Sequence, residues 1–189
     1  MEGCRPAEEA DLPRLADLAR AGIAELAPMR GGAVWLAREA RTEPLEDNLR
    51  LVLKDPDARV LGGTIDGAVV GYAVARVERL DDGRTLGVVD DIFVEEGARG
   101  VGVGEAMIDD LVAWCRSQGC IGVDAMALPG HRITKNFFET FGFTARKLVM
   151  HHTLVPDDDD DDDDDDDGGA GGAGGAGGAG GAAAAEEPA

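Results

Sequence analysis

Three glycines alternate with small apolar side chains in the segment Arg99-Gly100-Val101-Gly102-Val103-Gly104. The preceding residues, 86–94, are rich in β-branched and apolar side chains, which predicts a strand. The following residues, 104–118, have apolar side chains at helical spacing and predict a helix. A glycine-rich turn between a strand and a helix presents backbone N–H groups at the positive end of the helix, where phosphate binds. The segment therefore predicts an anion-binding loop, with Arg99 adding a charge; a turn without a ligand is the alternative.

The spacing of the glycines separates this loop from two common nucleotide-binding motifs. The ATP-binding P-loop requires Gly-x-x-x-x-Gly-Lys followed by Ser or Thr, and no Lys-Ser or Lys-Thr follows the loop here. The dinucleotide-binding motif reads Gly-x-Gly-x-x-Gly and lies in a parallel unit near the first strand. The loop here reads Gly-x-Gly-x-Gly and lies in the middle of the chain. Both motifs fit poorly.

The chain up to residue 155 alternates between helical and strand patterns. Apolar side chains at helical spacing predict helices over 7–26, 34–40, 44–53 and 133–141. Runs of β-forming residues predict strands over 58–65, 68–77, 86–94, 120–128 and 147–155. Asp66-Gly67 and Asp81-Asp82-Gly83 predict tight turns, so the first three strands form an antiparallel meander. This order predicts an α/β (α+β) fold with a mixed, mostly antiparallel twisted sheet flanked by helices.

The composition changes abruptly at residue 156. Residues 157–167 are all aspartate, and Gly-Gly-Ala repeats follow. Because this stretch has no large apolar side chain to bury, we expect one folded domain over 1–155 and a disordered tail over 156–189. The tail holds 13 acidic groups and no basic ones, so the formal net charge of −20 leaves −7 for the domain. The domain has no basic stripe, and we expect no nucleic-acid partner.

The cysteines and the N-terminal residues bear on location. Cys4, Cys115 and Cys120 do not have the spacing of a metal site or a disulfide framework, so no metal is expected. Residues 1–6 lack the apolar core of a signal peptide, and no run is apolar over the ~20 residues that span a bilayer. We therefore expect a cytoplasmic protein without a membrane partner.

Two blocks of the sequence resemble those of the GNAT acetyltransferases. Arg99 to Gly104 matches the family signature Arg/Gln-x-x-Gly-x-Gly/Ala. Phe137-Phe138-Glu139-Thr140-Phe141-Gly142-Phe143 is similar to a second block that typically reads Leu-Tyr-Glu-Lys-Leu-Gly-Phe. Asp91-Ile92-Phe93-Val94 looks like the central strand of the family. The resemblance covers about residues 4–155.

The resemblance implies acetyl-CoA as the acyl donor. Its pyrophosphate would lie on the amides of Gly100, Val101, Gly102, Val103 and Gly104. Its pantetheine arm would add to the strand end at Phe93 and Val94, where a bulge opens a slot for the thioester. A primary amine of a small molecule or a peptide would then attack directly, with a backbone N–H stabilising the oxyanion. Homodimers are common in the family.

Direct attack requires a group that removes a proton from the amine and a group that protonates the leaving thiolate. Asp90 and Asp91 are the candidate bases, and adjacent residues of a regular strand point to opposite faces. We favour Asp91; the alternative is that either carboxylate solvates an exposed strand face or caps a neighbouring element. The family's usual acid is the tyrosine of the second block, where this chain has Phe138. A non-catalytic acyl-CoA-binding module is therefore an alternative, as is cation or basic-protein binding through the Asp run.

The remaining polar candidates have weaker signals. Tyr72 is expected in the core or lining the channel. His131 is expected to cap a helix or to be exposed, and a place at the acceptor site is the alternative. Asn136 is expected on the surface, Cys115 in the core and Cys120 buried. His151 and His152 are expected to face solvent on the last strand.

Overall fold

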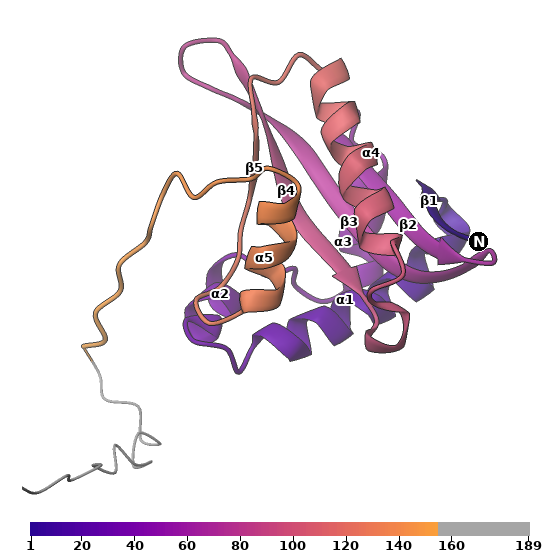
Figure 1. Ribbon diagram of the computed structural model, residues 1–189, viewed down its shortest axis with the longest axis horizontal. Coiled ribbons are helices and arrows are strands. Elements are labelled where there is room, and N and C mark those ends of the chain that lie inside the picture. The colour runs from indigo at the N-terminus through magenta and orange to yellow at the C-terminus, as the bar shows by residue number, and fades with distance from the viewer. Residues whose placement is uncertain (155–189) are drawn as a thin grey trace, which may run out of the picture. The chain divides into compact units, whose positions relative to one another are not determined.

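The computed structural model describes residues 1–154, and a five-stranded sheet lies at its centre (Figure 1). The strands follow the sheet in chain order, β1 (Glu2–Pro6), β2 (Ala58–Ile65), β3 (Ala68–Arg79), β4 (Thr85–Val94) and β5 (Val123–Ala125). β1 to β4 pair antiparallel, whereas β5 pairs parallel with β4. The sheet is therefore mixed and mostly antiparallel, which confirms the predicted fold class.

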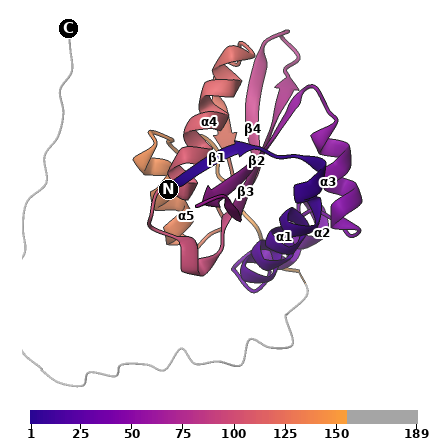
Figure 2. The same ribbon diagram turned by 90° about the vertical axis from the view of Figure 1, so that its right-hand side faces the viewer.

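Helices cover both faces of the sheet (Figure 2). On one face lie α1 (Leu12–Leu26) and α3 (Leu45–Leu53), with the short α2 (Gly32–Arg38) between them in sequence. On the other face lie α4 (Val103–Ser117) and α5 (Arg132–Thr140). Each face has its own apolar core because alternate side chains of β3 point to opposite sides: Tyr72 and Val74 pack under α1, and Ala73 and Ala75 pack under α4.

The predicted hairpin turns are confirmed by their backbone angles. Asp66 and Gly67 have φ angles of 49° and 86°, the pair of positive values that a type I′ turn requires between β2 and β3. Gly83 has a φ of 83° in the turn between β3 and β4. These turns set the register of the meander, and the register in turn places the two aspartates of β4.

Gly87 on β4 lets the sheet approach α4 closely. A Cβ atom at this position would lie 2.5 Å from Sγ and 3.1 Å from Cβ of the fully buried Cys115. We expect Gly87→Ala to lower the free energy of unfolding by about 2 kcal/mol, because the buried helix cannot move away. Urea denaturation measures this change. Gly3→Ala on β1, where no atom lies within 4 Å, is the matched control, and an equal loss in both variants would contradict the packing.

Several predicted boundaries are wrong. β1 was not expected, because Glu2–Pro6 has no alternating apolar pattern and becomes a strand only by pairing with β2. The predicted strand over 120–128 is reduced to Val123–Ala125. The predicted strand over 147–155 is absent: residues 147–154 have no regular structure and are exposed, since no neighbouring strand pairs with them in the described part of the chain.

Two further predictions concern the ends of elements. The first helix begins at Leu12 rather than residue 7, after the 3₁₀ helix Glu9–Asp11. The predicted tail, 156–189, lies outside the described residues. Among residues 1–154, no helix is long and apolar enough to cross a membrane.

Candidate active site

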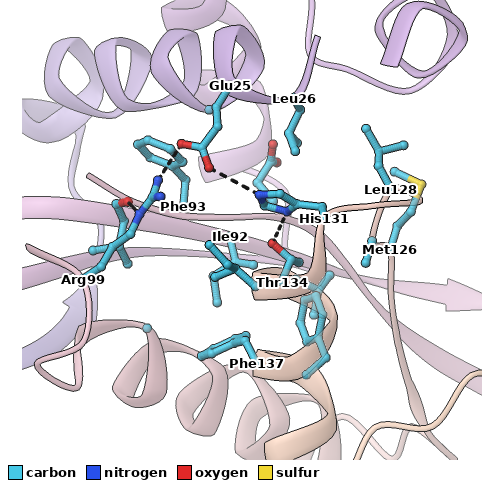
Figure 3. A pocket seen from close by; sticks show the side chains of 18 of the residues that line it. Glu25, Leu26, Ile92, Phe93, Arg99, Met126, Leu128, His131, Thr134 and Phe137 are labelled. Carbon is cyan, nitrogen blue, oxygen red and sulfur yellow. Dashed lines mark hydrogen bonds and ion pairs between the residues drawn. The ribbon is translucent and has the colours of Figure 1, made fainter. Parts of the chain in front are cut away.

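A cavity of about 300 Å³ opens beside the C-terminal half of β4. Its walls come from α1, the loop before α4, the segment after β5, and α5 (Figure 3). Asp90, Asp91 and Phe93 of β4, Gly102 of the glycine loop and Phe138 of α5 all line it. The fold therefore brings both sequence blocks and both candidate carboxylates to one cavity.

A β-bulge at Asp90 opens this cavity. In the register of β3 and β4, Val74 is opposite Asp91 and Ala75 is opposite Val89, so Asp90 is the extra residue. The parallel pairing of β4 with β5 extends no further than Val89. Past that point β4 and the segment after β5 form opposite walls of the cavity. The family resemblance implied a bulge at the strand end, at Phe93 and Val94, and the structure has the bulge earlier in the strand, at Asp90.

The bulge also turns both aspartates towards the same face of the sheet. Tyr72 and Arg76 lie four residues apart on β3 and so share a face. The Tyr72 hydroxyl donates to Asp91 Oδ1 at 3.0 Å, and Arg76 Nε donates to Asp90 Oδ1 at 3.2 Å. The expectation that the two carboxylates face opposite sides is wrong, because it assumed a regular strand.

Asp91 is held firmly by its neighbours. Arg41, from the segment between α2 and α3, donates from Nε to Asp91 Oδ2 at 2.6 Å and from Nη1 to Asn48 Oδ1 at 2.8 Å. The Arg41 and Asp91 side chains are 11% and 17% exposed. Burial and the negative charge of Asp91 raise the pKa of Tyr72 well above its ordinary value. Asp91 is thus the centre of a charged cluster beneath the cavity.

Asp90 is bound more loosely. Its carboxylate pairs with Arg76, whose side chain is 44% exposed, and the Asp90 side chain is itself 29% exposed. Loss of water around the carboxylate raises the pKa of Asp90, although Arg76 acts in the opposite direction. The group is therefore more basic than an ordinary aspartate and can be reached from the cavity.

The glycine loop has the backbone geometry that an anion site requires. Gly100 and Gly102 have φ angles of 75° and 100°, and Gly102 is the N-cap of α4. The first turn of a helix leaves its N–H groups without helical partners, so those of α4 are available to phosphate oxygens. Val103 is buried and anchors the loop against Gly63, while Gly104 packs close to Phe137. The residues present thus fit a pyrophosphate.

Arg99 lies next to the loop but is already paired. Its Nε donates to the Val94 carbonyl at 2.7 Å, and its Nη2 donates to Glu25 Oε2 at 2.6 Å. Its guanidinium carbon also lies 5.4 Å from the centre of the Phe93 ring. The sequence predicted that the positive charge of Arg99 would help to bind a phosphate. In the structure, Glu25 of α1 balances that charge.

Glu25 continues this chain of contacts to α5 (Figure 3). Its Oε1 lies 3.5 Å from His131 Nε2, and His131 Nδ1 lies 2.5 Å from Thr134 Oγ1. His131 stands at the N-cap of α5, as predicted, yet its side chain makes no capping bond. The side chain is 13% exposed and lines the cavity, so the expected exposed or capping role is wrong.

Phe138 is buried at the wall of the cavity. Its ring packs 5.5 Å from Phe137 and 5.2 Å from Phe143, measured between ring centroids. A benzyl side chain has no proton to give, so Phe138 cannot protonate a leaving thiolate. Tyr72, which was expected in the core or lining the channel, is buried in the core and also lines the cavity.

The structure also places the weaker candidates. Cys115 is buried and Asn136 is exposed, both as predicted, and Cys120 is only partly buried. His151 and His152 are exposed, although not on a strand.

Comparison with known proteins decides the family. A family model for the acetyltransferase (GNAT) family matches residues 24–143, which include both sequence blocks. The chain belongs to the GNAT family. GNAT acetyltransferases use acetyl-CoA and act on amines, and the residues around the cavity are consistent with that chemistry.

Individual relatives agree with this assignment. Glucosamine 6-phosphate N-acetyltransferase of Trypanosoma brucei brucei is 34% identical over 86 residues, covering 44% of this chain and 56% of the relative. The match thus spans little more than half of that relative's length. A crystal structure of a Trypanosoma brucei acetyltransferase is 28% identical with a TM-score of 0.56, covering 82% of this chain and 100% of that one.

The fold itself is shared more widely. The tetramutant of a Bacillus halodurans protein superposes with a TM-score of 0.70 at 16% identity, covering 80% of this chain and 99% of that one.

Three residues of the site were not predicted from the sequence: Glu25 and Met126, which line the cavity, and Arg41, which binds Asp91. Glu25 and Arg41 carry no motif, since each lies in a helical or loop segment with many other charged residues. Met126 follows the shortened β5 and was expected inside a longer strand. Their positions depend on how distant segments pack, and no local pattern could have identified them.

Proposed function

We propose that the chain is an acetyl-CoA-dependent N-acetyltransferase whose acceptor is a primary amine. The observation that carries this proposal is the single cavity shared by the glycine loop and the bulged carboxylates of β4. A donor on the loop and an amine beside Asp90 would meet at the strand end. The acetyl group would pass directly between them, without a covalent enzyme intermediate.

The donor is assigned to the loop and the outer edge of β4. Its pyrophosphate would accept hydrogen bonds from the amides of Gly100 to Gly104, and its pantetheine arm would lie along Phe93 and Val94. This placement is supported by the positive φ angles of the loop and by the end of the β4–β5 pairing at Val89. Because Arg99 now bonds the Val94 carbonyl, the arm would exchange places with that guanidinium.

Asp90 is our candidate for the general base, with Asp91 as an orienting group. The sequence favoured Asp91, but Arg41 and Tyr72 bind both of its oxygens and oppose proton uptake. Asp90 has a raised pKa and an accessible carboxylate, the properties expected of a group that accepts a proton near neutral pH. A water molecule between Asp90 and the amine could relay the amine proton to Asp90.

The acceptor class follows from charge and from the relatives. Glu25, Asp90, Asp91 and Glu105 line the cavity and would attract a cationic amine. The trypanosomal relative is named for glucosamine 6-phosphate, so this amine belongs in the first acceptor panel with polyamines and peptide N-termini. The buried Phe138 favours one rival, a non-catalytic acyl-CoA-binding module.

Thiol release from acetyl-CoA in the presence of an amine panel tests the proposal. We expect release that requires both the enzyme and an amine, with formation of the acetylated amine. Tight binding of acetyl-CoA without release for any amine would favour the binding module. Absence of acetyl-CoA binding would overturn both the proposed acetyltransferase and the binding module.

A further inference from the structure

The cavity contains few groups that could protonate a departing thiolate. Phe138 has no exchangeable proton, and the Tyr72 hydroxyl is bound to Asp91 with its pKa raised well above the ordinary value. Arginine is a permanent cation and does not donate its proton. Histidine is the side chain whose ordinary titration lies between pH 5 and 8, and His131 is the histidine that lines this cavity.

His131 is held in one orientation by contacts at both ring nitrogens. Nδ1 lies 2.5 Å from Thr134 Oγ1, one turn along α5, and Nε2 lies 3.5 Å from Glu25 Oε1 across the cavity. Thr134 and Phe138 are four residues apart and so lie on the same face of α5. His131 and Phe138 therefore line the same cavity from the same end of the chain, and Figure 3 shows the His131 ring between Glu25 and Thr134.

Charged groups of both signs surround His131. Glu25 of α1 faces Nε2 directly, and Arg99 lies behind Glu25 and offsets some of its charge. The carboxylates of Asp90, Asp91 and Glu105 line the same cavity. The N-terminus of α5 and the neighbouring Arg132 are positive.

We infer that His131 is the proton donor to the leaving thiolate, with Glu25 holding the imidazolium in place. The inference rests on the proposed function. As the amine nitrogen bonds to the acyl carbon, the carbon–sulfur bond breaks and its electron pair leaves on sulfur. The Nε2 proton passes to that sulfur, and the proton lost by the amine passes to Asp90. Exchange with water then returns His131 and Asp90 to their starting states.

Replacing the imidazole tests this role. We expect His131→Gln to lower kcat about 100-fold near neutral pH, while KM for acetyl-CoA stays within about twofold of the wild-type value. His152→Gln, at an exposed histidine, is the matched control and should behave as the wild type. Free imidazole should restore part of the activity of His131→Gln and leave the control unchanged.

The pH profile separates proton donation from a structural role. A proton donor acts only in its protonated form, so we expect kcat of the wild type to fall along an alkaline limb of the pH profile, and His131→Gln to lack that limb. Glu25→Gln removes the carboxylate that faces the imidazolium, so we expect the fall in kcat to begin at a lower pH. A mere packing role would change kcat and thermal stability together and leave the limb in place.

The outcomes distinguish this inference from the proposed function. A wild-type enzyme that transfers acetyl groups, together with a His131→Gln variant of unchanged kcat and pH profile, overturns the role of His131 alone. A wild-type protein that transfers acetyl to no amine overturns both. Loss of the alkaline limb with imidazole rescue supports the assignment.

Discussion

Replacing Gly102 with aspartate is expected to weaken acetyl-CoA binding roughly 100-fold or more. Gly102 has a φ of 100° at the N-cap of α4, a conformation that a side chain strains. The new carboxylate would also stand where the loop amides receive the pyrophosphate, and like charges repel. Calorimetric titration with acetyl-CoA measures the change in Kd.

Gly83→Asp separates loss of the site from loss of the fold. Gly83 has a φ of 83° in the turn between β3 and β4, and no atom lies within 4 Å of a Cβ built there. The backbone strain in Gly83→Asp is therefore similar to that in Gly102→Asp, but Gly83 does not line the cavity. We expect acetyl-CoA affinity to remain at the wild-type value in Gly83→Asp. Equal affinities in both variants, at equal stability, would contradict the placement of the pyrophosphate.

Asp90→Asn is expected to lower kcat by about 100-fold to 10,000-fold, the range for loss of a general base. Because the pKa of Asp90 is raised, the wild-type rate should climb with pH through a limb that lies above the ordinary pKa of an aspartate. That limb should disappear in Asp90→Asn. Steady-state rates at saturating acetyl-CoA across the pH range measure both effects.

Stability should change in a different way from activity. A carboxyl group whose pKa is higher in the folded state than in the unfolded state destabilises the fold once it is ionised. Stability is thus lost as pH rises from the ordinary carboxyl pKa through the raised one. Asp90→Asn removes this cost, so its free energy of unfolding at neutral pH should equal or exceed that of the wild type.

Asp91→Asn is the matched comparison. Removing that charge leaves the guanidinium of Arg41, 11% exposed, without its ionic partner. We expect a loss of about 2 kcal/mol or more in stability. If Asp91→Asn loses more activity than Asp90→Asn while remaining folded, Asp91 is the base and our choice between the two is wrong.

The sequence predicted the parts of the fold that depend on local signals. The turn at Asp66-Gly67 and the helix after the glycine loop follow from short-range chemistry. β1 could not be predicted, because its residues gain strand geometry only from pairing with β2. Residues 147–154 show the converse case, in which an apolar pattern is present but no described neighbour pairs with it.

In the proposed site, the donor half carries a sequence signal and the acceptor half does not. The loop motif singles out Gly100 to Gly104 without knowledge of any other segment. One extra residue in β4 turns Asp90 and Asp91 towards the same face of the sheet, where opposite faces were expected, and a bulge has no reliable sequence signal. Glu25 reaches His131 from a helix more than one hundred positions earlier in the chain. Such a contact depends on tertiary packing.

Transfer of a labelled acetyl group from acetyl-CoA to the best acceptor tests the central claim most directly. The wild type and Asp90→Asn are compared under conditions in which calorimetry shows both to be saturated with donor. We expect the wild type to place one labelled acetyl group on the amine for each thiol released, and Asp90→Asn to bind the donor but transfer it far more slowly. A wild-type protein that binds acetyl-CoA and labels no amine would contradict the assignment of this cavity as an acetyltransferase active site.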